Sequence, residues 1–327
     1  MSRLSQLATS PLLQNFAVTA SQAAIRPVGS FIAPMCEVPD LTFRYKVYTE
    51  NNRYRVPNTK RQPGARATVL GFSATDASLT LEPNALDFPI PNAEQLSDEG
   101  LQYAIMEAQS CLADASALAL ENEIITIAKA AAIASPLTVT SDFTSSAVDP
   151  VTILDQQILA VMKASKNGAA VKVLFGATKF QQFRDNPNVR GRFVTSNRGG
   201  GQAASSGKGG KSQTSTGNVG VVSPTIGDVS NLLITNPECE MSMMVIDTSA
   251  PGEASAISFL LDTICIVFAA NATPNRMDPS FMKTFARMGG FFQAGSYTTE
   301  DQRDQVLKMD WTTLPAVTNS AAVAAVQ

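Results

Sequence analysis

The residues that first suggest chemistry lie in a glycine- and serine-rich stretch, SSGKGGKS, at positions 205–212. A Gly-Lys-Ser in such a stretch resembles part of the loop that holds nucleotide phosphates through backbone N–H groups and a lysine. The spacing does not fit, because the glycine required five positions before Gly210 is replaced by Ser205. The context does not fit either, since Lys208 and Lys211 lie deep in a low-complexity tract. We therefore favour a solvent-exposed loop over a nucleotide site.

Other residue types that commonly carry catalysis are scarce. The chain has no histidine, which removes the commonest general base near neutral pH and the commonest metal ligand. Its cysteines are far apart and form no CxxC pair, so they indicate neither a thiolate metal site nor a redox pair. They are Cys36, Cys111, Cys239 and Cys265. We interpret them as small buried hydrophobic residues in a reducing compartment, and we expect no catalytic residue, cofactor or metal ion.

Composition indicates a folded protein that does not bind nucleic acid tightly. The chain has 327 residues, of which 44% are hydrophobic, enough for one elaborate domain or two ordinary ones. Its net charge of -3 differs from the strongly basic balance of domains that grip phosphates. Pro11, Gln14 and Asn15 interrupt the first apolar runs, and no stretch is apolar enough for a membrane helix. We therefore expect neither secretion nor membrane contact.

The N-terminal third predicts an irregular arm followed by a projecting β-element. Prolines at 27, 34 and 39 argue against a regular element in the first 40 residues. Residues 41–56 alternate apolar or aromatic with charged residues, the pattern of a strand with two unlike faces, and Asn51-Asn52 could form a hairpin turn. A basic loop containing proline and glycine follows, and residues 67–81 are rich in strand-forming side chains.

A long helix is predicted between residues 94 and 135. Apolar residues recur there at alternating spacings of four and three, at Leu101, Ile105, Ala108, Leu112, Ala115 and Ala119. Ser97 is the expected N-cap, and Pro136 marks the end. An unbroken helix of this span would be nearly 60 Å long at about 1.5 Å per residue.

The rest of the chain predicts an α/β alternation interrupted by a low-complexity loop. Asp149-Pro150 opens a second amphipathic helix, and VKVLFG and ATKFQQFRDN read as a buried strand and a short helix. Residues 196–220 contain many glycines and no large apolar side chain, so we expect an exposed loop there. Three later runs read as strands: NLLIT, MSMMVID and ISFLLDTICIVFAA.

The charge distribution suggests a contact between copies of the chain. From Arg44 to Arg66 there are seven basic residues against one acid, whereas from Ala67 to Ala128 there is no lysine or arginine and there are ten acids. Even spreading would place about five basic residues in the second segment. We expect the first segment of one copy to lie on the second segment of another. The candidate contact residues are Arg53, Arg55, Lys60, Arg61 and Arg66 with Glu94, Asp98, Glu99, Glu107 and Asp114. Neutralisation within one chain is the alternative.

The order of these elements, and three stretches of sequence, resemble the major capsid proteins of tailed bacteriophages, whose shell fold is shared with herpesvirus capsids. The stretches are APMCEVPDLTFRYKVYTENNRYRVPNTKRQPGARA, VKVLFGATKFQQFRDNPNVRGRF and SAISFLLDTICIVFAANATPNRMDPSFMKTF. The resemblance covers most of the chain and depends on these pieces occurring in the family's order.

This resemblance implies an α+β fold with a defined order of parts. The corresponding ranges are an N-terminal arm at 1–45, an extended β-hairpin loop at 46–92, a peripheral domain with the spine helix at 93–165, an axial domain with the glycine-rich loop 196–220 at 166–275, and a return to the peripheral domain at 276–327. The glycine-rich loop would then lie near the centre of pentamers and hexamers, where a segment without fixed packing suits both symmetries.

The same resemblance implies a structural protein, not an enzyme, that assembles into the pentamers and hexamers of an icosahedral head shell. Its implied partners are further copies of itself, a portal protein and packaged double-stranded DNA bound without sequence specificity; scaffolding and decoration proteins are further candidates. Because only about 40 irregular residues precede the first predicted strand, we expect a separate scaffolding protein or none. We expect assembly in the host bacterial cytoplasm and a final location in the virion. Lys60 lies where some relatives cross-link to an asparagine, but no matching acid and asparagine are evident.

Three alternatives remain open. A cellular nanocompartment shell, similar to an encapsulin, would have an enzyme gene beside its own, whereas a phage capsid gene lies beside terminase and portal genes. A nucleotide-binding enzyme that uses the glycine-rich loop would lose ATP binding when Lys211 is mutated. A phage tail or adhesion protein would form tubes or trimers and not closed shells.

Overall fold

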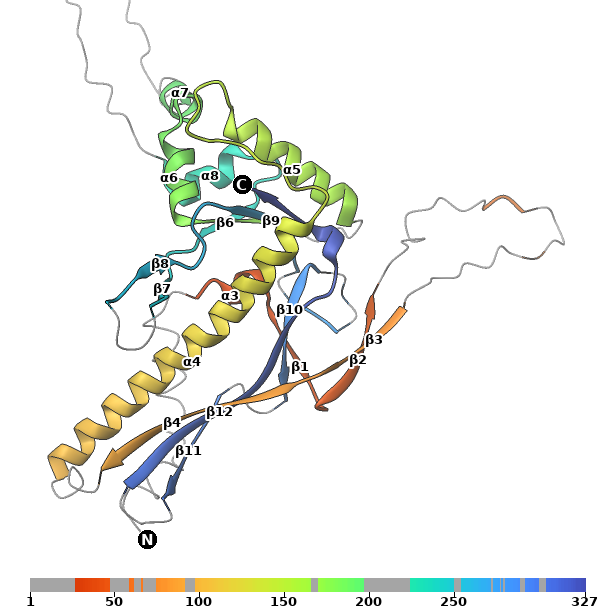
Figure 1. Ribbon diagram of the computed structural model, residues 1–327. Helices are drawn as coiled ribbons and strands as arrows, with labels where there is room; N and C mark the ends of the chain where they lie inside the picture. Colours follow the sequence, from red (N-terminus) through yellow and green to blue (C-terminus); the bar gives the residue numbers. More distant parts are fainter. Residues whose placement is uncertain are drawn as a thin grey trace, which may run out of the picture.

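The fold is taken from a computed structural model of the chain (Figure 1). It describes residues 27–47, 59–61, 66, 75–91, 98–165, 170–196, 224–249, 254–271, 273–276, 278, 280–288, 292–299 and 304–327. The predicted Asn51-Asn52 turn, the Ser97 cap and nearly all of the glycine-rich loop, including Lys208 and Lys211, lie outside these residues.

Helices and strands alternate along the described chain in an α+β arrangement. The helices are α3 (Gly29–Ile32), α4 (Asp98–Ala134), α5 (Pro150–Ser165), α6 (Ala177–Asp185), α7 (Pro187–Ser196), α8 (Ile226–Leu232) and the short 3-10 helix η4 (Ser320–Ala322). The strands are β1 (Met35–Val38), β2 (Thr42–Val47), β3 (Thr75–Thr80), β4 (Glu82–Pro91), β5 (Val171–Phe175), β6 (Glu238–Met241), β7 (Val245–Asp247), β8 (Ile257–Phe259), β9 (Cys265–Ala269), β10 (Met282–Arg287), β11 (Gln293–Thr298), β12 (Asp304–Val317) and β13 (Val323–Val326).

The largest core surrounds a four-stranded sheet with the strand order β13-β9-β5-β6. Every residue of β9 is buried, because helices cover this sheet; α5 packs on β9 and β13, and its Leu154, Ile158 and Val161 are fully buried. Strands covered in this way read as continuous apolar runs, as the sequence of β9 does. The sheet, with α5, α6, α7 and α8, forms the lobe in which the C-terminus lies (Figure 1).

A second sheet runs beside the first half of α4. Its strand order is β1-β10-β12-β11, and β4 pairs with the long strand β12 from Glu82↔Thr313 to Pro91↔Asp304. Among the described strands β4 pairs only with β12. Pro83, Pro89 and Pro91 occur at alternating positions of β4, so their nitrogens lie on the same side of the strand. Missing N–H groups make an edge a poor template for unwanted strand pairing.

Helix α4 connects the two cores. Its 37 residues span roughly 55 Å at ~1.5 Å per residue. In its first half Ala104, Ala108 and Leu112 pack toward β12, and in its second half Ile124 and Ala128 belong to the core of the four-stranded sheet. A single helix therefore fixes the positions of both sheets.

Most of the predicted elements are confirmed, including the long helix, the helix after Pro150, the strand VKVLF and the helix ATKFQQFRD. The buried stripe of α4 departs from the predicted one. Ala115 and Ala119 are exposed, and burial continues through Ala113, Ser116 and Leu120. The reason is that an α-helix turns every 3.6 residues, so a strict seven-residue spacing drifts by ~20° per repeat.

Two other predictions are wrong. NLLIT is not a strand: residues 231–232 end α8, and Thr235 and Asn236 adopt positive φ values of 71° and 47°. A capping box between Thr225 and Asp228 starts this helix, and Val229 and Leu233, four residues apart, bury one side of it.

Near the N-terminus, the prolines did not prevent regular structure, because α3 and β1 are four residues each and fit between them.

The other two predicted strand runs are each divided. MSMMVID contains the end of β6 and all of β7, and ISFLLDTICIVFAA contains β8 and β9. The break before β9 contains Asp262, whose backbone oxygen accepts a hydrogen bond from Lys179 N at 3.1 Å and whose Oδ1 accepts one from Thr178 N at 3.2 Å. Asp262 therefore satisfies N–H groups at the start of α6, which a continuous strand could not do.

Candidate subunit interface

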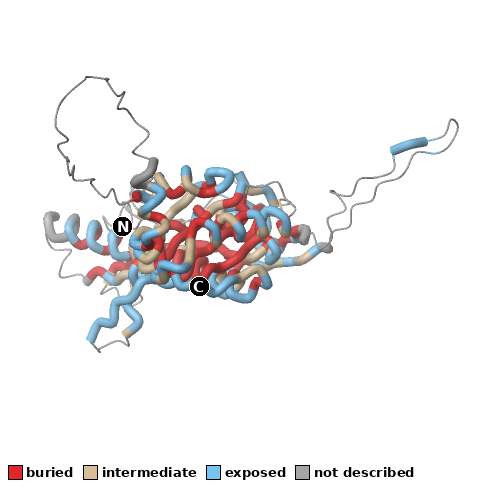
Figure 2. The backbone as a smooth tube through the Cα atoms, turned by 90° about the horizontal axis from the view of Figure 1, so that it is seen from above, coloured by how far each residue is buried: buried red, intermediate tan, exposed pale blue. Residues whose placement is uncertain are grey.

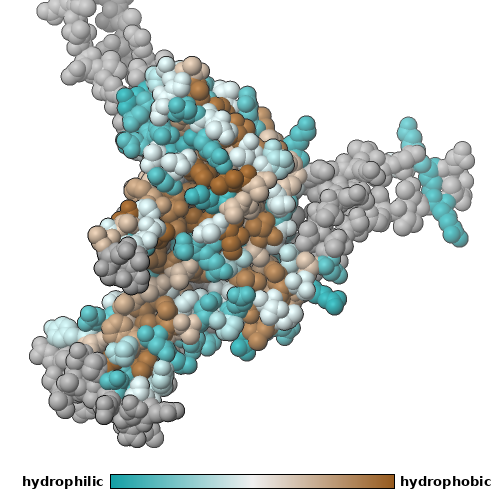
Figure 3. Space-filling model, viewed as in Figure 1, coloured by the Kyte–Doolittle hydropathy of each residue, from teal (hydrophilic) through white to brown (hydrophobic). Residues whose placement is uncertain are grey.

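The basic half of the predicted interface lies on a projection from the body. Lys60, Arg61 and Arg66 are exposed, and Arg53 and Arg55 lie outside the described residues. Residues 59–61 lie far from α4, beyond β2 and β3 (Figures 1 and 2). Their side chains are coloured as hydrophilic in Figure 3. Lys60 and Arg61 are therefore accessible to another molecule.

The base of this projection is anchored by aromatic packing. Strands β2 and β3 pair antiparallel from Thr42↔Thr80 to Val47↔Thr75. The ring of Phe43 lies 4.6 Å from that of Phe285 in β10, and the ring of Tyr45 lies 6.0 Å from it, measured between centroids. Phe285 is fully buried. The alternation read from the sequence is confirmed for these residues, because Phe43 and Tyr45 are buried whereas Arg44 is exposed.

The acidic half follows α4. Glu107 is exposed and Asp114 is half-buried, and Asp98 and Glu99 are the first two residues of the helix. Glu94 lies outside the described residues. Figure 1 shows β2, β3 and β12 between α4 and residues 59–61 of the same chain.

One member of the acidic run, Glu121, is not a surface charge. It is buried in α4, and its Oε1 and Oε2 accept hydrogen bonds from the backbone N–H groups of Val28 and Gly29, both at 2.8 Å. A Cβ added at Gly29 would lie 2.4 Å from Oε2, so only glycine leaves room for this contact. Glu121 thus holds α3 against α4. No feature of the sequence around Glu121 indicated this contact, because Val28 and Gly29 are more than 90 positions away.

Burial gives Glu121 a definite pH dependence. Burial raises the pKa of this carboxyl above its ordinary value of 4.5, the hydrogen bonds from Val28 and Gly29 lower it, and the charge of Glu240 raises it. A raised pKa in the folded state contributes stability that is present below the unfolded pKa and is lost as pH rises through the folded pKa. We expect the free energy of unfolding of Glu121→Gln to change less between pH 5 and pH 8 than that of the wild type.

Urea unfolding of both proteins at several pH values checks this prediction. For each protein the slope of the free energy of unfolding against pH is obtained. Comparing the two slopes cancels the opposite contribution of carboxylates such as Asp142 and Asp228, whose pKa values are lowered by hydrogen bonds from neighbouring threonines. Identical slopes for the two proteins would contradict the role of Glu121.

The cysteines only partly match the prediction. Cys36 and Cys265 are buried, Cys239 is half-buried and Cys111 is exposed on α4, and all four are free thiols. Burial raises the pKa of Cys239 to about 12, which disfavours the nucleophilic thiolate. Among the described residues, no three cysteine or acidic side chains gather as a metal site would require.

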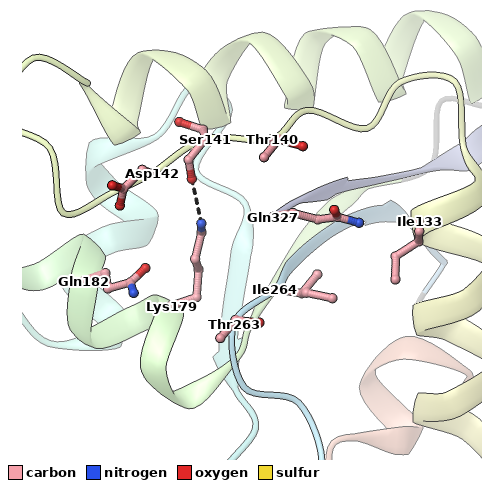
Figure 4. A pocket seen from close by; sticks show the side chains of 9 residues that line it. All are labelled: Ile133, Thr140, Ser141, Asp142, Lys179, Gln182, Thr263, Ile264 and Gln327. Atoms are coloured by element: carbon pink, nitrogen blue, oxygen red, sulfur yellow. Dashed lines mark hydrogen bonds between the residues drawn. The ribbon is translucent and has the colours of Figure 1, made fainter.

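Lys179 lies in a cavity of about 440 Å³ (Figure 4). The lysine Nζ donates a hydrogen bond to Ser141 O at 2.8 Å and lies 4.3 Å from the ring centroid of Phe143. Burial lowers the pKa of this amine. These contacts join α6 to the segment before α5, so Lys179 has a structural explanation.

Among the described helices, none has both the length and the hydropathy that a membrane span requires.

Known proteins were compared with this chain by sequence and by structure. No protein-family model and no curated protein sequence matches it. Solved structures, in contrast, match this chain. A phage-related protein from Bordetella bronchiseptica aligns over 97% of this chain and 96% of its own, with 17% identity and a TM-score of 0.70. The capsid structure of cyanophage P-SCSP1u aligns over 90% and 86%, with 10% identity and a TM-score of 0.52.

Another structure, from Microbacterium phage Oxtober96, aligns over 92% of this chain and 90% of its own, with 13% identity and a TM-score of 0.51. These alignments extend over both sheets and α4, so they concern the whole architecture and not one local motif. The chain therefore has the fold of the major capsid proteins of tailed bacteriophages.

Proposed function

We propose that this chain is the major capsid protein of a tailed bacteriophage, a structural protein that catalyses no reaction. Copies assemble into pentamers and hexamers that close an icosahedral head shell around double-stranded DNA. The observation that carries this proposal is the fold, which is shared over at least 90% of the chain with a phage-related protein and a cyanophage capsid structure.

The exposed charges support a specific mode of assembly. A basic projection carrying Lys60, Arg61 and Arg66 lies on the acidic side of α4, near Glu107 and Asp114, in an adjacent copy. Each exposed pair contributes only ~0.2–1 kcal/mol, so these charges determine register and assembly rate more than affinity. Repetition of the contact across a shell multiplies its effect.

The division into parts belongs to the same proposal. The 1–45 arm, the 46–92 hairpin loop, the 93–165 peripheral domain, the 166–275 axial domain and the returning 276–327 segment follow the order of the capsid fold. Two neighbouring elements also contact the sheet assigned to the axial domain: α5 packs on β9, and β13 pairs with β9. The axial core thus includes chain from outside 166–275.

Further partners follow from the proposed shell. A portal protein would occupy one vertex, and scaffolding or decoration proteins could join the shell during or after assembly. Packaged DNA would contact the inner wall without sequence specificity, because the chain has a net charge of -3 and lacks a strongly basic balance. The shell would assemble in the host bacterial cytoplasm and become part of the virion.

Electron microscopy of the expressed protein tests the function. The chain is produced alone and together with the neighbouring phage genes, and the products are imaged. Closed hollow particles of uniform size are expected. Tubes, trimers or persistent monomers under all of these conditions would contradict the proposal.

Charge reversal tests the mode of assembly. The triple change Lys60→Glu, Arg61→Glu and Arg66→Glu is expected to reduce the yield of shells about 10-fold or more, because like charges would then face one another. Adding Glu107→Lys and Asp114→Lys to the same chain should restore part of the yield. Particle yield is measured by sedimentation and microscopy.

The control compares two single changes, Arg61→Glu and Arg287→Glu, which alter net charge equally. Arg287 is also exposed but lies at the end of β10 in the body of the molecule. A larger effect of Arg61→Glu is expected. Equal effects, or no rescue by the reversed acids, would show that α4 is not the surface contacted by the projection.

A further inference from the structure

The hairpin formed by β7 and β8 carries apolar side chains into solvent. Met243, Val245, Ile257 and Phe259 are exposed, Ile257 by 69%. The hairpin projects from the lobe that contains the four-stranded sheet, on the side away from α5 (Figure 1). Apolar groups gathered on one exposed element, and not scattered singly, indicate a surface that is covered in the working assembly.

Pairing places Val245, Ile257 and Phe259 on one face, together with Asp247. Val245 is opposite Phe259 and Asp247 is opposite Ile257, so alternate residues of both strands point the same way. The root is fixed in the core, because Met244 and Leu260 are buried and Leu260 N donates to Met244 O at 2.9 Å. The hairpin is therefore a firmly rooted element with one apolar face.

The outer end of the hairpin is ordered by Asp247. Its carboxylate accepts hydrogen bonds from Ser249 N and Oγ at 2.9 and 2.7 Å, from Ser255 Oγ at 2.6 Å and from Ala256 N at 3.0 Å. These bonds hold the pKa of Asp247 well below its usual range. An isolated two-stranded hairpin is only marginally stable in water. Because these hydrogen bonds already order the hairpin, less conformational entropy is lost when it binds another surface.

A second apolar surface lies on the outer face of α5. Leu159 and Met162 are exposed, and the exposed Lys163 follows them, while the opposite face of the helix is buried against β9 and β13. In the strand order β13-β9-β5-β6, α5 lies over the β9 and β13 side, whereas β7 continues the chain from β6 at the other edge. The two apolar surfaces thus lie on opposite sides of one lobe.

The charges of the two surfaces are complementary. No lysine or arginine occurs between Lys211 and Arg276, a segment that includes Glu238, Glu240 and Asp247 and the whole hairpin. The outer face of α5 instead carries Lys163, and the exposed Lys129 lies in the last turns of α4. A surface that is apolar and acidic matches one that is apolar and basic, whereas two copies of the hairpin would repel each other.

We propose that the β7–β8 hairpin of one copy packs on the outer face of α5 in the next copy. Because the two surfaces are different and lie on opposite sides, repetition of this contact leads from copy to copy around a ring. The contact therefore lies between neighbours within one pentamer or hexamer. This inference rests on the proposed shell function and adds the partner surface to it.

Disulfide cross-linking tests the contact in assembled particles. Ile257→Cys or Phe259→Cys is combined with Leu159→Cys or Met162→Cys, giving four double variants in a Cys111→Ser background that removes the exposed native thiol. At least one pairing is expected to give a ladder of linked multimers that stops at the ring size, with about 10-fold more product than the control pair Ile257→Cys and Met288→Cys. Met288 is nearly as exposed as Ile257 but directly follows β10.

The outcomes separate this inference from the function on which it rests. Shells that form but show no ladder with any of the four pairings overturn the hairpin contact and leave the capsid function standing. Failure of the wild-type chain to form particles under any condition overturns the function itself. Linked dimers formed on mixing a hairpin single variant with an α5 single variant support the contact, because only different molecules can then be joined.

Polar substitution gives an independent measurement. Ile257→Ser with Phe259→Ser is expected to slow particle formation about 10-fold or more, because apolar anchors carry most of the energy of an interface. The urea midpoint of the unassembled protein should stay close to that of the wild type, since these side chains are exposed. Met288→Ser is the matched control. Unchanged assembly of the double variant would contradict the proposal.

Discussion

Replacing Gly176 with alanine is expected to lower the free energy of unfolding by roughly 2–4 kcal/mol, among the larger effects of any single change. Gly176 lies between β5 and α6. A Cβ there would lie 2.2 Å from the backbone oxygen of Asp262 and 2.8 Å from that of Ile264. Those atoms cannot move away freely, because they accept hydrogen bonds from Lys179 N and Gly176 N.

Urea unfolding of unassembled protein measures this effect. The control is Gly227→Ala in α8, where an added Cβ meets no atom within 4 Å and a helical glycine is replaced by a better helix former. That change should stabilise the protein by about 0.5–1 kcal/mol. If Gly176→Ala were as stable as the wild type, the close approach of β5 and the segment before β9 would be wrong.

Replacing Phe285 with alanine is expected to destabilise the protein by roughly 3–5 kcal/mol and to release the base of the basic projection. The ring is fully buried and packs against Phe43 and Tyr45 of β2, so its removal leaves a cavity where the hairpin meets the sheet. We expect the yield of particles to fall even at temperatures where the protein remains folded.

Two measurements separate these consequences. Thermal unfolding reports the lost packing, and hydrogen exchange of β2 and β3 reports release of the hairpin, which should exceed any change in β9. Phe285→Leu serves as the control, because it retains much of the buried volume and should cost less than alanine. Wild-type protection of β2 in Phe285→Ala would indicate that the hairpin is anchored by other contacts.

The proposed shell function requires rigid attachment of the elements that contact a neighbouring copy. Helix α4 joins the two sheets, Glu121 attaches α3 to that helix, and Phe285 attaches the projection to the second sheet. The basic projection extends from the site of Phe285, and the β7–β8 hairpin is rooted by the buried Met244 and Leu260. A projecting element can set the register of a neighbour only if its base does not move.

The sequence alone was sufficient to predict features that depend on residues close together in the chain. The spacing of apolar residues predicts α4 and α5, and the alternation around Phe43 and Tyr45 predicts β2. The charge segregation between residues 44–66 and 67–128 is likewise visible without coordinates, and the order of elements indicated the capsid fold.

Features that depend on contacts between residues distant in the chain could be recognised only in the tertiary structure. Glu121 reads as one more surface acid until Val28 and Gly29, more than 90 positions away, are seen to donate to it. NLLIT has strand composition, yet Leu232 ends α8, the buried Leu233 caps that helix, and Ile234 is exposed. The unpartnered apolar face of β7–β8 also has no sequence signature, because an apolar residue in a strand is ordinarily buried. Periodicity records which residues share a face, whereas burial depends on what the rest of the chain brings against that face.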